Sequence, residues 1–422
     1  MSEPASDGLT FRTFRAADEP DLMPGWYEAQ SRGFHQGRTS EELRERFGHH
    51  LDADHAVLRG AWQQAPALGS GAIPVATYAS YDKTLNTGRG LERVRMVSDV
   101  TVSPTHRRRG LLRTMITEDL ADAAEQGVPL AVLTASEGAI YGRFGFGPAV
   151  FRHRLEVDTG AGFALRPFAD DGVVELVEPL EAWPVVTSVF ALFHERTRGS
   201  VERPQFYEPI LTGEFNFEDG RDTKLRTAVH LDGSGDADGY VAYRPGPRKD
   251  GRRTIHVSDL VALTTAAYLR LWRFLADLDL SDSVEWDNAP VEDPLSWALV
   301  DPFTARVTRQ VDSLWVRVLD VPAALRSRPW GRDGEVVLEV DDPLGHAAGR
   351  FRLVTRDGAA EVSDADDTGA DVRMDADTLG ALHLGGVGIG TLGRAGRISG
   401  PGVEAFAAMA DVGPAPYCIT GF

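Results

Sequence analysis

Cysteine is nearly absent from this sequence: Cys418 is the single one among 422 residues. That count excludes an intrachain disulfide scaffold and a zinc site built from several thiolates, and we interpret Cys418 as a small, buried apolar residue. Met1 to Thr10 is polar and acidic, without the basic and apolar parts of an export signal. No apolar run approaches the roughly 20 residues that cross a bilayer. We therefore expect a soluble, cytoplasmic protein with no membrane partner.

Basic residues are also fewer than acidic residues. Lysine and arginine number 44 against 63 aspartates and glutamates, so the formal net charge is −19. A partner with a phosphate backbone requires the opposite sign, and we expect no nucleic-acid binding. The acidity is explained either by plain solubility or by an acidic cleft that attracts a cationic small molecule. With 42% apolar and 25% charged residues, the chain has a normal globular composition and is too long for one ordinary core.

Three regions follow one another along the chain. Residues 1–158 mix strand-like and helix-like segments, residues 159–305 repeat that mixture, and strand-like pieces dominate residues 306–422. The last region ends in glycine-rich loops and one short apolar helix, Val403–Met409. A glycine run at 388–393 matches the dinucleotide-binding pattern, but a helix-like stretch precedes it and no helix is expected after it. We assign that run to a loop.

A short internal repeat links the first two regions. Val97-Ser98-Asp99-Val100 returns as Val257-Ser258-Asp259-Leu260, each time in an apolar strand that leads within a few residues to an amphipathic helix. Two interpretations stay open: the second region is a diverged copy of the first, or the four matched positions are a coincidence. The second copy lacks the arginines and the glycine that follow the first, so the chemistry of those residues occurs once per chain.

The segment around the first copy is typical of an anion-binding turn. Apolar residues alternate along its strand, as they do where one face is buried: Val94, Met96, Val100 and Val102. A turn with four arginines and a glycine, Arg107 to Arg113, then leads into an amphipathic helix. The first amides of a helix lack internal partners and the helix dipole adds positive charge, so a pyrophosphate is a natural occupant. The alternative is a solvated basic helix start.

These residues resemble the core of a GNAT N-acetyltransferase. The resemblance rests on the strand and helix, on Arg108-Arg109-Gly110-x-Leu112, and on Leu130–Ser136 with Ile140-Tyr141-Gly142-Arg143-Phe144-Gly145-Phe146. The stretch Val100–Gly147 is similar to one branch, the Eis (enhanced intracellular survival) family of aminoglycoside acetyltransferases. That likeness continues in order through Leu314–Arg317 and Val321–Leu325 to an aromatic last residue.

The resemblance implies an α/β (α+β) fold with two tandem GNAT-like domains, 1–158 and 159–305, and a C-terminal sterol-carrier-like α+β domain, 306–422. It also implies acetyl-CoA as the acetyl donor, no metal, and a homo-hexameric assembly. The family's cofactor-binding positions correspond to Val100, Thr101 and Val102 along the pantetheine arm, to Arg108, Arg109, Gly110, Leu111, Leu112 and Arg113 around the pyrophosphate, and to Ser136 and Glu137 on the neighbouring strand.

Two catalytic groups are implied by the resemblance. Tyr141 matches the family's general acid. A phenol stays protonated at neutral pH and can protonate the departing thiolate, so its chemistry suits this role. The terminal carboxylate on Phe422 matches the family's general base. A carboxylate is ionised at neutral pH and can accept a proton, so its chemistry suits this role. The structural alternative for Tyr141 is a half-buried aromatic, and that for Phe422 is a frayed chain end, although the apolar residues Tyr417–Ile419 favour a packed tail. Gly421 stands where the family often has an acidic residue, which leaves the substrate range open.

Three further residues are candidates for an amine-binding pocket. Asp99 precedes Val100 and therefore faces the other side of the strand, where it either pairs with a cationic amine or forms a salt bridge with Arg93 or Arg95. Trp26 and Phe34 are candidates for the pocket wall, and core packing is the alternative for each.

The implied function is transfer of acetyl from acetyl-CoA to an amine of a polycationic small molecule of the aminoglycoside type, and hence antibiotic resistance. Two alternatives belong to other classes. One is a protein-lysine N-acetyltransferase, and the other is a non-enzymatic protein that binds acyl-CoA or a lipid.

Overall fold

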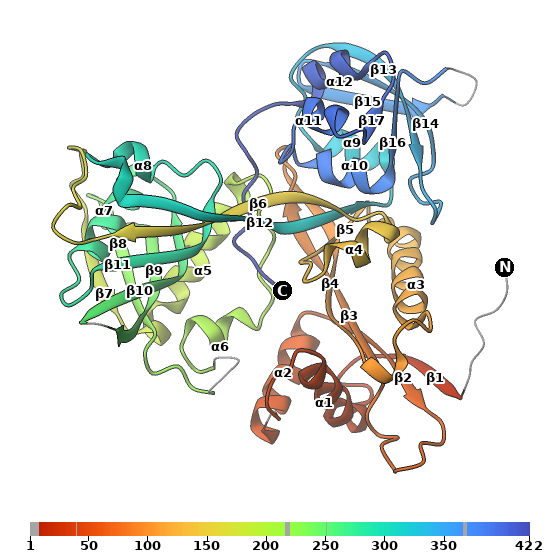
Figure 1. The fold of residues 1–422 in the computed structure, drawn as a ribbon, viewed down its shortest axis with the longest axis horizontal. Helices are drawn as coiled ribbons and strands as arrows, with labels where there is room; N and C mark the ends of the chain where they lie inside the picture. Colours follow the sequence, from red (N-terminus) through yellow and green to blue (C-terminus); the bar gives the residue numbers. More distant parts are fainter. Residues whose placement is uncertain (1–7, 39, 216–219, 250, 366–368) are drawn as a thin grey trace.

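A computed structural model of the chain describes residues 8–38, 40–215, 220–249, 251–365 and 369–422. Two α/β regions share one long sheet, and a smaller α+β region packs beside the first of them (Figure 1). The first region contains, in chain order, β1 (Leu9–Phe14), α1 (Met23–Gly33), α2 (Glu41–Ala53), β2 (Val57–Gln63), β3 (Ala76–Asn86), β4 (Leu91–Val102), α3 (Leu111–Glu125), β5 (Leu130–Leu133), α4 (Gly138–Tyr141) and β6 (Gly147–Asp158).

The second region contains β7 (Val173–Val177), α5 (Pro179–Arg196), α6 (Tyr207–Leu211), β8 (Arg226–Leu231), β9 (Ala237–Lys249), β10 (Arg252–Ala262), α7 (Thr265–Ala276), β11 (Ser283–Pro290), α8 (Leu295–Ala298) and β12 (Ala305–Val318). The third contains α9 (Val321–Ser327), β13 (Gly334–Asp341), β14 (Gly349–Arg356), β15 (Ala359–Asp364), β16 (Val372–Asp375), α10 (Ala376–His383), α11 (Ile389–Arg394), β17 (Ile398–Ser399) and α12 (Val403–Ala410).

Two long strands, β6 and β12, join the first two regions into one sheet of twelve strands. The order is β1-β2-β3-β4-β5-β12-β6-β11-β10-β9-β8-β7. The first part of β12 pairs with residues 152–157 of β6, and its last part lies between β6 and β5. The sequence pattern placed the start of the third region at residue 306, because a strand-like pattern does not reveal which sheet the strand joins. By its pairing, β12 lies in the large sheet, and the third region begins after Val318.

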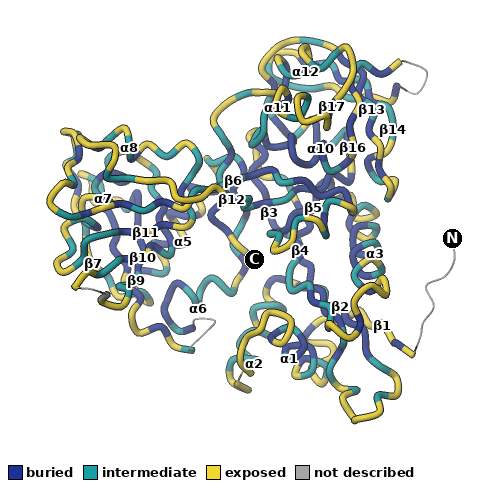
Figure 2. Tube along the Cα trace, in the orientation of Figure 1, coloured by how far each residue is buried: buried dark blue, intermediate teal, exposed yellow. Residues whose placement is uncertain are grey.

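The third region has its own five-stranded sheet, ordered β15-β14-β13-β16-β17. Helix α10 of this region packs against β6 and β12, and its backbone lies almost in contact with the backbones of the two strands. A Cβ atom added at Gly147 or Gly380 would lie only 1.9 or 2.1 Å from a backbone oxygen across this junction. Buried residues continue through the junction (Figure 2), so that Met96 of β4 and Leu338 of β13 share one apolar core.

Most elements expected in the third region are present, including α12 where a short apolar helix was predicted. The loop predicted at residues 388–393 is wrong, because α11 begins at Ile389 directly after the glycine at 388. Its glycines favour a loop by intrinsic propensity, and packing overrides that preference. The run still follows helix α10 rather than a strand, so the context of a dinucleotide site is missing.

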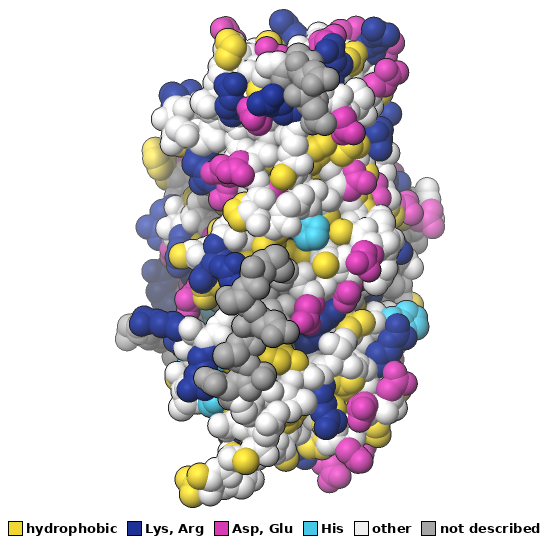
Figure 3. Space-filling view, turned by 90° about the vertical axis from the view of Figure 1, so that its right-hand side faces the viewer, with side chains coloured by type: hydrophobic (Ala, Val, Ile, Leu, Met, Phe, Trp, Pro, Cys, Tyr) yellow, Lys and Arg dark blue, Asp and Glu magenta, His cyan; other side chains and the backbone are white. Residues whose placement is uncertain are grey.

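Acidic and basic side chains are interspersed over the face of the molecule shown in Figure 3. Within the ranges that the structure describes, no helix has the length and apolar character needed to cross a membrane.

The internal repeat of the sequence is also a structural repeat. Strand β4 pairs in parallel with β5 as far as Val97 and Leu133, and β10 pairs in parallel with β11 as far as Val257 and Trp286. Each strand then shifts its register against the strand that precedes it, and each is followed by a helix, α3 or α7. The second region is therefore a diverged copy of the first, as one of the two interpretations predicted.

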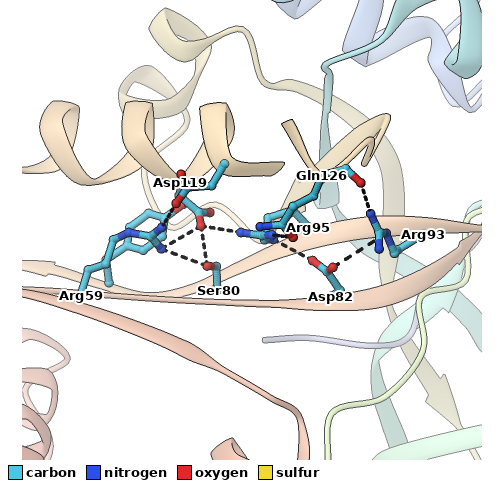
Figure 4. A network of polar contacts seen from close by, with 9 residues as sticks. Arg59, Ser80, Asp82, Arg93, Arg95, Asp119 and Gln126 are labelled. Carbon is cyan, nitrogen blue, oxygen red and sulfur yellow. Dashed lines mark hydrogen bonds and ion pairs between the residues drawn. The ribbon is translucent and has the colours of Figure 1, made fainter. Parts of the chain in front are cut away.

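Helix α3 is tied to the sheet by a buried carboxylate, Asp119 (Figure 4). Its oxygens accept hydrogen bonds of 2.7–2.8 Å from four side chains, those of Arg59, Tyr78, Ser80 and Arg95. Strands β2, β3 and β4 each provide at least one of these donors, and the two guanidinium groups offset the buried negative charge. The network therefore fixes α3 over the sheet and, with it, the start of that helix.

We expect Asp119→Ala to destabilise the protein by about 3–5 kcal/mol, because it leaves two guanidinium groups buried without their shared carboxylate. The measurement is the shift of the urea-unfolding midpoint that reports on the first region. Asp122→Ala is the matched control: Asp122 also accepts a hydrogen bond from Arg59, at 2.7 Å, but its side chain is 52% exposed. That loss is expected to cost about 1 kcal/mol or less. Equal shifts for the two variants would contradict the assignment.

Candidate active site

Strand β4 does not keep its alternation to the end. The backbone of Asp99 is left-handed, with φ 51°, and the register with β3 shifts by one residue there. Val94 and Met96 accordingly face the core that contains α1, whereas Val100 and Val102 pack on the side of α3. The prediction of a single buried face is thus wrong for the last two members of the series. A bulge of this kind re-aims side chains, and here it turns Asp99 toward α1.

Strands β4 and β5 separate close to this bulge. Their last paired residues are Val97 and Leu133, and β4 continues to Val102 beyond the end of β5. Thr101 is buried, with its hydroxyl oxygen 2.6 Å from that of Thr77 in β3. The backbone of residues 100–102 consequently has a strand neighbour on one edge and an opening on the other. A GNAT enzyme needs such an opening for the pantetheine arm.

The turn that follows β4 combines an uncapped helix start with exposed arginines. Arg108 and Gly110 both have left-handed backbones, with φ 65° and 81°, and Gly110 precedes α3 without a side-chain cap. Arg109 and Arg113 are exposed, and within the described ranges no carboxylate lies at ion-pair distance from them. The next two apolar residues turn inward: Leu111 is buried and Leu112 partly buried. Free amides and unpaired guanidinium groups at one helix start suit a pyrophosphate.

The corresponding helix of the second copy begins differently. The hydroxyl of Thr264 accepts a hydrogen bond from the amide of Ala267 at 3.1 Å and donates one to the carboxylate of Asp238 at 2.6 Å. The start of α7 is therefore capped by the chain's own side chains, next to a negative charge. Of the two copies, only the first offers an anion an open helix start.

A cavity of about 1020 Å³ lies between the first two regions. Its walls come from α1, α2, β4, the segment after β5, α6 and β10, and from the last residues of the chain. The residues expected from the sequence that line it are Phe34, Asp99, Val100, Ser136, Tyr141 and Phe422. Other aromatic side chains complete much of the wall: Tyr27, Phe47, Tyr81, Phe206, Tyr207 and Phe215.

Tyr141 ends the short helix α4, and 8% of its surface is exposed. Its ring packs edge-on against Phe146, with 6.3 Å between ring centres. Burial, and to a smaller extent the negative charge of Glu137, raises the pKa of Tyr141 to about 12. The phenol therefore keeps its proton at neutral pH and is available as a donor. Glu137 itself is exposed and does not line the cavity.

The end of the chain passes between the first two regions and stops in the cavity (Figure 1). Thr420 donates a hydrogen bond to the carbonyl of Val201 at 2.7 Å, and Cys418 is buried, as predicted. At the terminus, the hydroxyl of Thr134 donates to a carboxylate oxygen of Phe422. The tail is thus packed along its length rather than frayed. The sequence had suggested a packed tail through its apolar residues, but it held no signal for Thr134 as the partner.

Asp99 faces the cavity without a cationic partner from the described part of the chain. Gln30 of α1, which the sequence did not single out, donates a hydrogen bond to it at 3.2 Å. The salt-bridge alternative is wrong, because Arg93 and Arg95 both pair with Asp82, at 3.8 and 2.7 Å. Burial raises the pKa of Asp99 to about 6. This carboxylate is therefore charged at neutral pH and protonates just below it.

Trp26 does not line the cavity, so the pocket-wall interpretation is wrong and the alternative, core packing, is confirmed. Its side chain is fully buried in the core under α1, and the indole nitrogen donates to the carbonyl of Arg59 at 3.0 Å. The spacing of large apolar residues along a helix indicates a buried face but not whether that face meets a core or a cavity. Phe34, just after α1, does line the cavity and is 45% exposed.

Comparisons with known proteins agree with this architecture. Models of an acetyltransferase (GNAT) domain match residues 13–149 and 199–318, and a model of a sterol carrier protein domain matches residues 321–419. N-acetyltransferase Eis of Mycobacterium tuberculosis is 38% identical over 309 residues, which cover 72% of this chain and 73% of that protein. The chain belongs to the Eis family of GNAT N-acetyltransferases.

Two further proteins match over nearly the whole length. A protein of Streptomyces griseus named as an uncharacterized N-acetyltransferase is 34% identical over 414 residues, 94% of this chain and 97% of that protein. The crystal structure of Eis1 from Mycobacterium abscessus superimposes with a TM-score of 0.81 at 29% identity, covering 98% of this chain and all of that one. The expected fold, two GNAT domains followed by a sterol-carrier-like domain, is confirmed.

Membership of the Eis family makes the chain an N-acetyltransferase, and GNAT acetyltransferases use acetyl-CoA as the acetyl donor. The opening between β4 and β5 and the helix start beside it are suited to that donor. Among the described residues, no three or more His, Cys, Asp and Glu side chains are grouped as a metal ion requires.

Proposed function

We propose that the first domain transfers acetyl directly from acetyl-CoA to a primary amine, with Tyr141 as general acid and the carboxylate of Phe422 as general base. The observation that supports this is one of position. Tyr141, from the first domain, and Phe422, from the end of the third region, line the same cavity, although 281 residue numbers separate them along the chain (422 − 141). Direct transfer requires the acid, the base and both reactants in one place.

The proton balance follows from the chemistry of the two groups. The terminal carboxylate accepts a proton from the ammonium group of the acceptor, so that the nitrogen lone pair forms the new bond to the acetyl carbon. The bond between that carbon and sulfur breaks, and the departing thiolate takes the proton of the Tyr141 hydroxyl. The nitrogen loses its second proton to the resulting Tyr141 phenolate, directly or through water, so that a neutral amide forms, and the protonated terminal carboxyl releases its proton to solvent. The opening beside Val100 holds the pantetheine arm, and the exposed arginines after β4 hold the pyrophosphate.

The acceptor that suits the cavity best is a polycationic small molecule of the aminoglycoside type. Asp99 presents a carboxylate without a cationic partner, and the terminal carboxylate adds a second negative charge. The aromatic wall offers faces for cation–π contacts. Release of free CoA with aminoglycosides, with lysine peptides and with no acceptor separates this proposal from a protein-lysine acetyltransferase, which would label lysines and give no turnover with aminoglycosides.

The hexamer implied by the family stays a proposal as well. Light scattering coupled to size-exclusion chromatography measures it directly, and six times the 45.9 kDa chain mass is the expected result.

Tyr141→Phe is expected to lower kcat by roughly 100-fold or more while the Kd for CoA stays within about twofold. The ring still packs against Phe146, so only the proton donor is lost. Stopped-assay rates and calorimetric CoA titration give the two numbers. Unchanged turnover would remove Tyr141 from the mechanism.

Extending the chain by a few residues past Phe422 should abolish transfer without unfolding the protein, because the carboxylate moves away from the cavity. The matched control carries the same residues at the N-terminus. Acetyl transfer and thermal unfolding are measured on both proteins. A fully active C-terminal extension would exclude the terminal base.

Asp99 predicts a pH dependence of acceptor binding. With its pKa raised to about 6, the carboxylate is charged above that pH and neutral below it, so affinity for a cation falls as the pH drops. The Kd of a polyamine acceptor, measured with CoA but without an acetyl group, is expected to rise between pH 7 and 5 with a slope approaching tenfold per pH unit. Asp99→Asn should bind weakly at every pH in this range. An unchanged pH profile in that variant would contradict the assignment.

A further inference from the structure

The groove of the second acetyltransferase copy is filled by the chain's own tail. The parallel pairing of β10 with β11 ends at Trp286, and the hydroxyl of Tyr417 donates to the carbonyl of Asn288, two residues beyond, at 2.5 Å. The ring of Tyr417 packs edge-on against Phe193 of α5, and Ile419 is buried in the same core. The place that corresponds to the pantetheine opening of the first copy thus holds Tyr417 and its neighbours.

Tyr207, at the start of α6, binds the backbone of Gly421, the residue before the terminus. Its hydroxyl accepts a hydrogen bond from the amide of Gly421 at 2.7 Å and lies 3.2 Å from the carbonyl of the same residue, to which it donates. Burial raises the pKa of Tyr207 to about 12, so the hydroxyl keeps the proton that it donates. The ring stacks on Phe206, with 5.3 Å between centres, and lies 4.7 Å from the guanidinium carbon of Arg203.

Arg203 links Tyr207 to Asp259, which belongs to the motif repeated in the two acetyltransferase copies. Its guanidinium group forms an ion pair with Asp259 at 2.6 Å and contacts the hydroxyl of Tyr240 at 2.9 Å. Asp259 is the second-copy counterpart of Asp99, whose side-chain partner among the described residues is Gln30 rather than a cation. Both carboxylates line the cavity, but among the described residues only Asp259 has a cationic partner, the arginine that supports the tail.

The first domain holds the terminus from the opposite side. Thr134 follows Leu133, the last residue of β5 that pairs with β4, and its hydroxyl donates to the terminal carboxylate. The carboxylate is thereby fixed at the point where the two strands separate.

We propose that the second acetyltransferase copy serves as a cradle for the chain end, and that Tyr207 of this copy and Thr134 of the first domain are positioning residues for the carboxylate of Phe422. This inference rests on the proposed function, since a positioned terminus raises turnover only if the carboxylate is the base.

The test uses the full-length chain and two measurements. Carboxypeptidase releases the last residue only from an accessible end, so the rate of Phe422 release, followed by mass spectrometry, reports on the cradle. The second measurement is kcat separately from the KM for acetyl-CoA. Tyr207→Phe and Thr134→Val each remove a hydroxyl and keep the shape. Tyr243→Phe is the matched control, because Tyr243 is a buried tyrosine of the second domain that does not line the cavity.

We expect Tyr207→Phe and Thr134→Val to release Phe422 at least about tenfold faster and to lower kcat by about tenfold to 100-fold, as small misplacements of catalytic groups do. The KM for acetyl-CoA should stay unchanged. Thr134→Ser, which keeps the hydroxyl, should rescue most of the kcat, and Tyr243→Phe should behave as the unaltered protein.

The possible outcomes separate the two claims. Unchanged release of Phe422 in both variants would overturn the cradle, whatever happens to kcat. Faster release with unchanged kcat would support the cradle and overturn the terminal carboxylate as base. A loss of kcat that Thr134→Ser does not rescue would overturn Thr134 as a positioning residue.

Discussion

The structure depends on one constraint: the parallel strands β4 and β5 separate within a continuous sheet. Beyond Val97 and Leu133, backbone groups of β4 lose their neighbour on one edge, and buried groups of that kind need another partner. The bulge at Asp99 and the fixing of α3 by Asp119 hold the opening in place. The second copy opens at the equivalent residue and is closed by Tyr417 of the tail. The first opening borders the cavity, whereas the second holds the tail of the chain.

The distribution of charge also differs between the two acetyltransferase copies. The chain is strongly acidic, yet its exposed arginines after β4 lie beside the open helix start, whereas the corresponding helix start of the second copy faces Asp238. Inside the cavity the negative charge of Asp99 is exposed to a ligand instead, because none of the residues described in the structure pairs it with a cation. In the proposed reaction, attraction for the phosphate-bearing donor and for the cationic acceptor is thereby separated in space.

Local patterns in the sequence predicted α3, the arginine turn, the repeat and the packed tail, because each depends on neighbouring residues. The bulge was missed, since alternation along β4 is interrupted by the backbone of one residue, Asp99. For Trp26 the sequence left both core packing and the pocket wall open, because burial alone does not distinguish a core from a cavity wall. Partners distant in sequence had no signal at all: Gln30 for Asp99, and Thr134 and Tyr207 for the tail. The pairing of β12 with the large sheet is likewise a long-range fact that no local pattern encodes.

The most direct measurement is a crystal structure of the full chain with CoA bound. The account predicts that the sulfur lies in the opening between β4 and β5, with the hydroxyl of Tyr141 within hydrogen-bond reach. It also predicts the carboxylate of Phe422 on the acceptor side of the sulfur, close enough to reach a bound amine directly or through one water. A terminus that leaves the cavity, or a sulfur bound far from both groups, would contradict the central claim.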